Sequence, residues 1–413
     1  MTAAPESDGP TSSAPCRRNE HHDYSLQLNR WFLKPIGAWP ESRATTTAER
    51  LLSRVIQTTC YALIAFTVVP CMLYFYFEEQ DDLDTKMNSV GPVSHWIMSG
   101  INYTSLLWRG EDIRRCIEHM ESDWCTVSRR ADRAAMLRHA KFGRSVAGFC
   151  AVFMHGGVFS YSVVNSLTPP IVDATGNGTV SAPRRLPCPF YSKLLDTSRD
   201  PANEIVLLMQ FLSGFVANSI TVGACSLAAV FAMHVCGQFA VLYMWLNELI
   251  DEGKDERTAE RKLANIVEHH LRVLNFVSRF EKIMNQICMV ELVGCTLNLC
   301  LLGYCSIKEW NARNTKTITT YGLVFVSVSF NIFIFCYIGE IITEQCKKVG
   351  EMAYFTNWYR LPHKTALGMV LIISRSSVVI KITAGKLVQL SLITFGDVIK
   401  TSAAYLNILR KII

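Results

Sequence analysis

Seven long apolar stretches constrain this 413-residue chain more than any other feature. They lie near residues 55–77, 87–108, 142–164, 205–231, 283–305, 317–342 and 387–409. A helix needs about 20 apolar residues to cross the hydrocarbon core of a bilayer. Only helices and closed barrels satisfy their backbone polar groups in lipid, and these stretches lack the period-two alternation of strands. The sequence therefore predicts an all-α polytopic membrane protein with seven transmembrane helices.

The distribution of Lys and Arg predicts the orientation of the chain. Of the 41 basic residues, 27 lie in the gaps 1–53, 109–141, 248–282 and 343–385, whereas the alternate gaps 78–90, 165–203, 306–316 and 410–413 hold 10. Cationic loops stay on the cytoplasmic side. We therefore expect a cytosolic N-terminus and an extracellular C-terminus. Asn177, in the sequon Asn177-Gly178-Thr179, falls in a gap assigned to the outside and is a candidate glycosylation site.

The apolar stretch 205–249 allows two interpretations. It runs about 45 residues, or roughly 65 Å as one helix. A hairpin of two spans would give eight spans and return the C-terminus to the cytosol. No proline, charge cluster or turn pair marks a hairpin loop, so we expect a single helix that projects past the inner leaflet.

The gaps divide the chain into four parts. We expect a cytosolic N-terminal segment over 1–52, irregular through about residue 25, and a helical bundle over 53–342. A cytosolic segment follows over 343–385, and the last span belongs to 386–413. Residues 248–282 keep a helical apolar spacing and are expected to form an amphipathic helix that leads into the fifth span. The apolar run 366–380 is too short to span and suits a buried cytosolic helix.

No catalytic or metal-binding motif is found. The 15 cysteines include no CxxC pair, and most lie in spans, where cysteine packs as a small apolar residue. Metalloprotease, nucleophile-elbow and nucleotide-binding patterns do not occur. We expect no enzymatic activity, no metal, no cofactor and no nucleic-acid partner.

Ionisable residues inside spans are costly and mark functional candidates. Glu291 lies in the fifth span, and Asp397 and Lys400 lie in the seventh. The last two are three residues apart on a helix, so mutual pairing and a role in conduction are both open.

The seventh span is rich in small and polar residues, which is typical of a helix that packs tightly or lines water. Thr401, Ala404, Ile408 and Lys411 fall on one stripe of this helix. Repeated in an oligomer, the stripe would make a narrow pore closed by an apolar ring.

Three segments carry a resemblance to a known family. The seventh span, LSLITFGDVIKTSAAYLNIL at 390–409, resembles the C-terminal signature of insect odorant receptors. FCYIGEIITEQC at 335–346 and NWYRLP at 357–362 fit the same family, and the likeness is greatest to the receptors of ants and bees. The resemblance is specific in the C-terminal third and agrees only in architecture before it.

The resemblance implies a subunit of an odorant-gated, non-selective cation channel in the plasma membrane of olfactory sensory neurons. Such a subunit binds a volatile or hydrocarbon odorant and assembles with a shared co-receptor in a heterotetramer surrounded by lipid. Residues 343–385 would hold the anchor between subunits, including the first half of helix 7, and 386–413 would line the pore. In the family's register Ile408 falls at the gate and Lys411 near the outer mouth, where the co-receptor is neutral. A ring of lysines opposes cation entry, which puts conduction by a homotetramer in doubt.

The family's ligand pocket lies in the outer halves of helices 2–6. Here the matching candidates are Trp96, Gly100, Tyr103, Met154, Gly157, Tyr161, Met209, Leu212, Tyr304, Tyr321 and Phe325. Apolar and aromatic walls with few polar groups suit such ligands. For each residue, ordinary helix packing is the equally open alternative.

Three other functions remain as alternatives. An insect gustatory receptor shares the topology, but its usual C-terminal signature is missing. A G-protein-coupled receptor predicts an outer N-terminus, against the charge distribution. A transporter predicts an internal repeat, and none is seen.

Overall fold

The computed structural model describes residues 20–41, 45–78, 83–127, 129–167, 186–195, 197, 201–252, 255–311, 313 and 315–412. Its helices are α1 (Glu20–Leu33), α2 (Thr47–Phe77), α3 (Leu83–Trp108), α4 (Gly110–Thr126), α5 (Arg130–Leu167), α6 (Ala202–Glu252), α7 (Glu256–Asn311), α8 (Thr315–Phe355), the 3-10 turn η1 (Trp358–Arg360), α9 (His363–Ser377) and α10 (Leu392–Ile412). Two short strands, β1 (Thr383–Ala384) and β2 (Val388–Gln389), pair antiparallel. The predicted all-α class is confirmed.

Six of the predicted spans fall within one long helix each, in α2, α3, α5, α6, α7 and α8, and the seventh falls mostly in α10. Within the described residues, α2, α5, α6, α7 and α8 contain stretches long and apolar enough to cross a membrane. In α10, Asp397 and Lys400 lower the hydropathy, and α3 begins with charged and polar residues. These two helices complete the seven spans.

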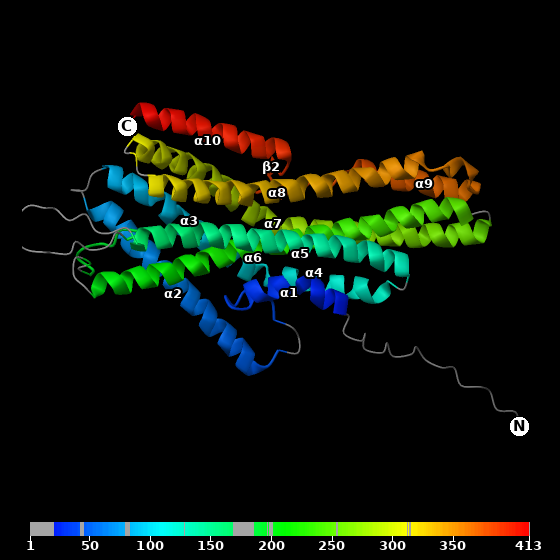
Figure 1. Ribbon diagram of the computed structural model, residues 1–413. Helices are drawn as coiled ribbons and strands as arrows, with labels where there is room; N and C mark the ends of the chain where they lie inside the picture. Colours follow the sequence, from blue (N-terminus) through cyan, green and yellow to red (C-terminus); the bar gives the residue numbers. More distant parts are fainter. Residues whose placement is uncertain are drawn as a thin grey trace, which may run out of the picture.

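The longest helices run side by side along most of the molecule (Figure 1). The 51 residues of α6 form one unbroken helix, about 75 Å long. The interpretation of 205–249 as a single helix is therefore confirmed. Likewise α7 continues for 56 residues from the charged stretch into the fifth span. Both helices are much longer than a bilayer requires, so their ends project beyond it.

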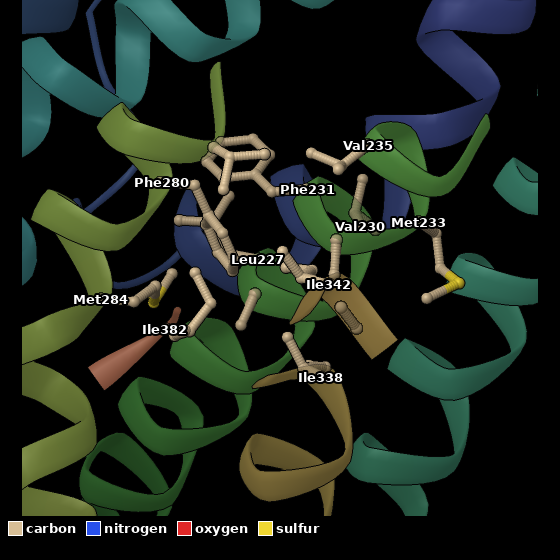
Figure 2. Packing of buried hydrophobic residues seen from close by; sticks show 14 of the residues in the cluster. Leu227, Val230, Phe231, Met233, Val235, Phe280, Met284, Ile338, Ile342 and Ile382 are labelled. Carbon is tan, nitrogen blue, oxygen red and sulfur yellow. The ribbon is translucent and has the colours of Figure 1, made fainter. Parts of the chain in front are cut away.

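The main core lies where α6, α7 and α8 meet. Figure 2 shows Phe231 of α6 opposite Phe280 of α7, with Ile342 of α8 beside them. The two phenylalanine rings pack edge to face, with centroids 6.2 Å apart. Ile382, from the segment before β1, closes the same cluster (Figure 2). The residues that lead into α10 are thereby fixed to the centre of the bundle.

The start of the last helix differs from the prediction. The span was expected at 387–409 and its segment at 386–413. Instead the hairpin and a short link through Ser391 come first, and α10 begins at Leu392. Gly385 and Lys386 both have positive φ in the turn, a conformation typical of tight hairpins. The Gly385 N–H donates to the carbonyl of Asn285 at 2.9 Å, which ties the turn to α7.

Outside the spans, the predicted cytosolic segments contain further helices, among them α1, α4 and α9. α9 packs on α8 and α7 at the opposite end of the molecule from α10 (Figure 1). Its Met369 and Ile372 are buried, which confirms a short packed helix in the run 366–380. α1 begins at Glu20, so the expectation of irregular chain through residue 25 is wrong over its last six positions. The cause is burial, since Leu26 packs into the main core.

A buried ionic network joins α4, α6 and α7. The Asp123 carboxylate accepts from Arg272 Nε at 2.6 Å and pairs with His234 Nε2 at 2.9 Å. His119 Nε2 lies 3.7 Å from the same carboxylate. Burial alone raises the pKa of Asp123, but its hydrogen bond to His234 and the charges of His234, His119 and Arg272 outweigh burial, so that the pKa lies below its usual value. This network holds α4 against the projecting ends of α6 and α7.

Candidate functional site

A cavity of about 160 Å³ lies among α3, α5, α6, α7 and α8. Its lining is mainly apolar and comes from residues that include Met87, Pro92, Trp96, Met98, Met154, Gly157, Val158, Leu207, Phe211, Gly214, Leu301, Leu302, Tyr321, Val324 and Val328. Polar side chains are fewer: Asn88, His95, Gln210, Asn218, Thr221, Glu291, Asn298, Ser327 and Asn331. An apolar chamber with a small number of placed polar groups is typical of a small-molecule site.

The segment 186–195 closes one side of this cavity. Pro187 lines it directly. Gln210 of α6 holds the next residue in place, because its Oε1 accepts from the Cys188 N–H at 3.2 Å and its Nε2 donates to the Cys188 carbonyl at 2.8 Å. Cys188 is fully buried beside Cys71 of α2 and Trp96 of α3. This described part of the predicted outer loop therefore covers the cavity. Asn177 lies outside the described residues.

The wall formed by α3 is fixed by hydrogen bonds across the bundle. Trp96 Nε1 donates to Ser213 Oγ of α6 at 2.9 Å. Ser94 Oγ donates to Asn298 Oδ1 of α7 at 3.0 Å, and Asn298 Nδ2 donates to the carbonyl of Gly294 at 2.9 Å. These bonds orient the indole ring and both polar groups of Asn298.

Glu291 of α7 forms the most polar part of the cavity wall and is only 1% exposed. Asn102 Nδ2 of α3 donates to Glu291 Oε1 at 2.6 Å, and Asn331 Nδ2 of α8 donates to Glu291 Oε2 at 2.5 Å. Cys295 Sγ donates to Oε2 at 3.7 Å. Three helices thus meet at one carboxyl group.

Four of the predicted ligand residues line this cavity: Trp96, Met154, Gly157 and Tyr321. Gly100, Tyr103, Met209, Leu212, Tyr304 and Phe325 are not in its wall. Tyr161 lies in α5, and its side chain is outside the described residues.

Tyr103 shows why some of the predicted ligand residues do not lie in the wall of this cavity. It lies close to the C-terminal end of α3, away from the cavity, and its hydroxyl donates to the carbonyl of Ile36 at 2.5 Å. Gly100 faces Ile64 of α2 instead. Neither residue lines the cavity, because the direction of the chain gives depth only roughly and gives no rotation about the helix axis.

Sequence reasoning overlooked several polar residues of the cavity. His95, Gln210, Asn218, Asn298 and Asn331 line it, and each interrupts an apolar span, which is a signal that sequence alone displays. Glu291 was recognised as an intramembrane charge but was not predicted to line the same cavity as Trp96 and Tyr321.

The last helix carries the candidate pore residues. Asp397 Oδ1 and Lys400 Nζ lie 3.7 Å apart, so the predicted pairing is present, although both side chains are mostly exposed. One face of α10 is fastened to α7 by Ser402 Oγ, which donates to the carbonyl of Thr296 at 3.1 Å. The stripe Thr401, Ala404, Ile408 and Lys411 is exposed.

A groove of about 770 Å³ runs between α10 and α7, with Thr401 and Ile408 in its wall. Ala404 and Lys411 do not line it. Within the described residues of one chain, therefore, the stripe remains exposed.

Comparison with known proteins identifies the family. The chain matches the family model described as 7tm Odorant receptor over residues 82–403. The chain belongs to the 7tm odorant receptor family. The predicted resemblance to insect odorant receptors is confirmed, and so is a multi-pass membrane protein. This is a family of receptors and not of enzymes.

Individual odorant receptors match over shorter stretches. The chain is 23% identical to Odorant receptor 10 of Aedes albopictus over 231 residues, which cover 55% of this chain and 61% of that one. It is 25% identical to Odorant receptor 82a of Drosophila melanogaster over 229 residues, covering 55% of this chain and 58% of that one. The chain therefore aligns with less than two thirds of the length of these curated relatives.

Solved structures match over nearly the whole chain. The insect olfactory receptor OR5 from Machilis hrabei, in complex with eugenol, has a TM-score of 0.76 at 13% identity and covers 95% of this chain and 100% of that one. A second structure of the same receptor gives a TM-score of 0.74 at 15% identity, with the same coverage. The fold is therefore that of an insect olfactory receptor, with seven transmembrane helices.

Proposed function

We propose that this chain is the odorant-binding subunit of a heteromeric, odorant-gated, non-selective cation channel in the plasma membrane of olfactory sensory neurons. Its partner would be an odorant receptor co-receptor. The observation that carries the proposal is the mainly apolar cavity within the bundle of an odorant receptor family member. At about 160 Å³ it is smaller than the roughly 300–1,000 Å³ typical of drug-sized ligands. A small volatile molecule fits such a space.

Relatives support the two other parts of the proposal. The chain is 24% identical to the Odorant receptor coreceptor of Aedes aegypti over 156 residues, or 38% of this chain and 32% of that one. The structure of OR5 from Machilis hrabei was solved in complex with eugenol. A likeness to both kinds of protein is expected of a subunit that binds an odorant and assembles with a related chain.

The proposed assembly gives a role to each part of the chain. Residues 53–342 would bind the odorant, 343–385 would form the anchor between subunits, and α10 within 386–413 would line the pore. On α9, Leu367, Val370 and Leu371 are at least half exposed. Exposed apolar groups on a helix outside the spans favour burial against a neighbouring subunit.

The proposed topology places α9 and the projecting ends of α6 and α7 in the cytosol and the C-terminus outside. It rests on the distribution of Lys and Arg, 27 of which lie in the gaps assigned to the cytosol. An N-terminal epitope tag should stain only after permeabilisation. Staining of intact cells would overturn the topology and favour a G-protein-coupled receptor.

Whole-cell current in a heterologous cell tests the channel function. The chain is expressed alone and then with an insect co-receptor, and a broad odorant panel is applied. We expect an odorant-evoked cation current with the co-receptor that persists when G-protein signalling is blocked. A current abolished by that block would refute the channel proposal.

Two substitutions test the pore assignment. Ile408→Ala should raise the current without odorant, because it removes an apolar gate residue. Lys411→Gln should raise cation conductance, because it removes a positive charge from the outer mouth. Leu392→Ala is a control on the same helix, about four and a half turns from Ile408. Unchanged basal current and conductance in both test variants would place the gate elsewhere.

A further inference from the structure

The polar end of the cavity has an unusual balance of charge. The Glu291 carboxyl group is buried among three helices, and within the described part of the chain no lysine or arginine lies within ion-pair distance of it. Its contacts are two amide groups and one thiol. A carboxylate in such a place is costly unless a positive charge accompanies it.

Beside this carboxyl group, two buried amide oxygens also lack a hydrogen-bond donor. Asn102 and Asn331 each use the Nδ2 group on the carboxylate, one on each oxygen. Their Oδ1 atoms are both buried without a hydrogen-bond partner. The two side chains are 0% and 5% exposed, so both amide groups are shielded from bulk solvent. Two orphaned acceptors therefore flank a carboxylate.

Exchanging the oxygen and nitrogen positions of either amide group does not give every acceptor a donor. An Oδ1 atom that faces the carboxyl group needs a proton on Glu291, and a single proton serves only one of the two asparagines. The nearby Asn298 does not supply a donor either, because its Nδ2 donates to the Gly294 carbonyl at 2.9 Å and to Met98 Sδ at 3.6 Å. The group that completes this site must bring several donors from outside the protein.

We propose that the cavity takes a small organic amine as its ligand, with the ammonium group placed at Glu291 and Asn331 of its wall. Asn102 does not line the cavity and holds the other carboxylate oxygen in place. An alkylammonium ion offers N–H donors and one positive charge, which match the Glu291 carboxylate and the orphaned Oδ1 of Asn331. Its hydrocarbon part would lie along the apolar wall that includes Leu301 and Val328. This inference rests on the proposed function, because it names the ligand class of the same cavity.

Other occupants satisfy the site less well. An alcohol has one O–H donor and no charge, so it leaves the carboxylate uncompensated and at least one acceptor unpaired. An aldehyde or ester brings only acceptors. A sodium ion supplies the charge but leaves the apolar part of the cavity unfilled, and it is a distinct outcome of the test.

The first experiment uses cells that express the chain with the co-receptor. Pentan-1-amine, pentan-1-ol and pentanal, matched in length, are applied at pH 7.4. We expect the amine to be the most potent of the three. Glu291→Gln keeps the shape of the side chain but removes its charge. It should raise the half-maximal concentration for the amine roughly ten- to a hundredfold, as expected for hydrogen bonds to a charged group, and change that for the alcohol by far less.

Glu204→Gln is the matched control, since Glu204 lies exposed in the first turn of α6. It should leave the amine response unchanged. If pentanol or pentanal evokes current and the amine does not, the ligand class is wrong while the channel function stands. An equal effect of Glu291→Gln on all three compounds would likewise overturn the amine site and show a packing role.

A binding measurement separates this inference from the proposed function. The purified chain in detergent is heated with each compound, and the wild type should gain thermal stability from pentan-1-amine beyond that from pentan-1-ol, since a ligand that binds the native state raises Tm. This comparison needs neither current nor a folded Glu291→Gln variant. Equal shifts for amine and alcohol refute the proposal. If NaCl raises Tm but choline chloride does not, and adding the amine raises Tm no further, the cavity holds a sodium site instead.

Discussion

Replacing Gly339 by alanine should disturb the junction between α8 and α10. A Cβ atom built at Gly339 would lie 2.5 Å from the Leu390 carbonyl oxygen and 2.6 Å from the Leu390 Cβ. Leu390 joins β2 to α10, is 1% exposed, and its N–H donates to the carbonyl of Ile382 at 2.9 Å. The obstacle is therefore held backbone rather than the tip of a flexible side chain.

The size of the effect follows from that overlap. Ordinary contact begins at 3.4 Å, so the backbone of Leu390 must retreat by about 0.9 Å. Overpacking of this kind typically costs about 1–3 kcal/mol. Alanine favours a helix over glycine by about 1 kcal/mol, which offsets part of the loss. Gly322→Ala is the matched control in α8, because nothing lies within 4 Å of its Cβ position.

The difference between the two variants isolates the overlap, since both gain the same helix propensity. We expect Gly339→Ala to be about 1–3 kcal/mol less stable than Gly322→Ala. In thermal unfolding of the purified chain at one scan rate, this corresponds to an apparent Tm lower by a few degrees. Its odorant-evoked current should also change, because the displaced junction carries α10. If the two variants unfold at the same temperature, the close contact at Leu390 does not constrain this junction.

Further predictions concern three other sites. Burial and the nearby Arg375 lower the pKa of His270 from 6.5 to about 4. Between these pH values the unfolded chain binds more protons than the folded chain. Stability should therefore fall as pH drops from 6.5 towards 4, by at most about 1.4 kcal/mol per pH unit. His270→Gln should flatten that decline in a thermal melt, whereas substituting the distant cavity residue Trp96 should not. Asp123→Asn should cost roughly 1.5–3 kcal/mol, since it weakens buried bonds to charged groups, and a denaturation curve as stable as wild type would refute this. Tyr103→Phe should cost about 1–2 kcal/mol through the unpaired carbonyl of Ile36 and leave odorant selectivity intact, whereas Trp96→Phe should shift half-maximal odorant concentrations several-fold.

Much of the architecture could be predicted because the bilayer imposes simple rules. The number of spans follows from apolar length. Six of the predicted spans lie within one helix each, and the seventh lies in α10 except for its first five residues. The unbroken α6 was foreseen because residues 205–249 contain no turn signal. The hairpin before α10 was missed, because strands of two residues are too short to show alternation.

The wall of the cavity was predicted only in part. Trp96 and Tyr321, which were among the predicted ligand residues, lie in this wall, because position along a span gives approximate depth. Tyr103 does not, because depth says nothing of the direction in which a side chain points around the helix axis. That direction depends on which neighbouring helix is packed against each face.

The sequence by itself determined the class of the protein, its seven spans, its family and the presence of a costly charge at Glu291, since each is a property of local composition or of a continuous motif. Only the tertiary structure decided that Glu291 faces a cavity and that Asn102 and Asn331 meet it there. These three residues come from three helices and lie 189 and 40 positions apart. Their convergence depends on helix rotation and packing, which no local pattern encodes.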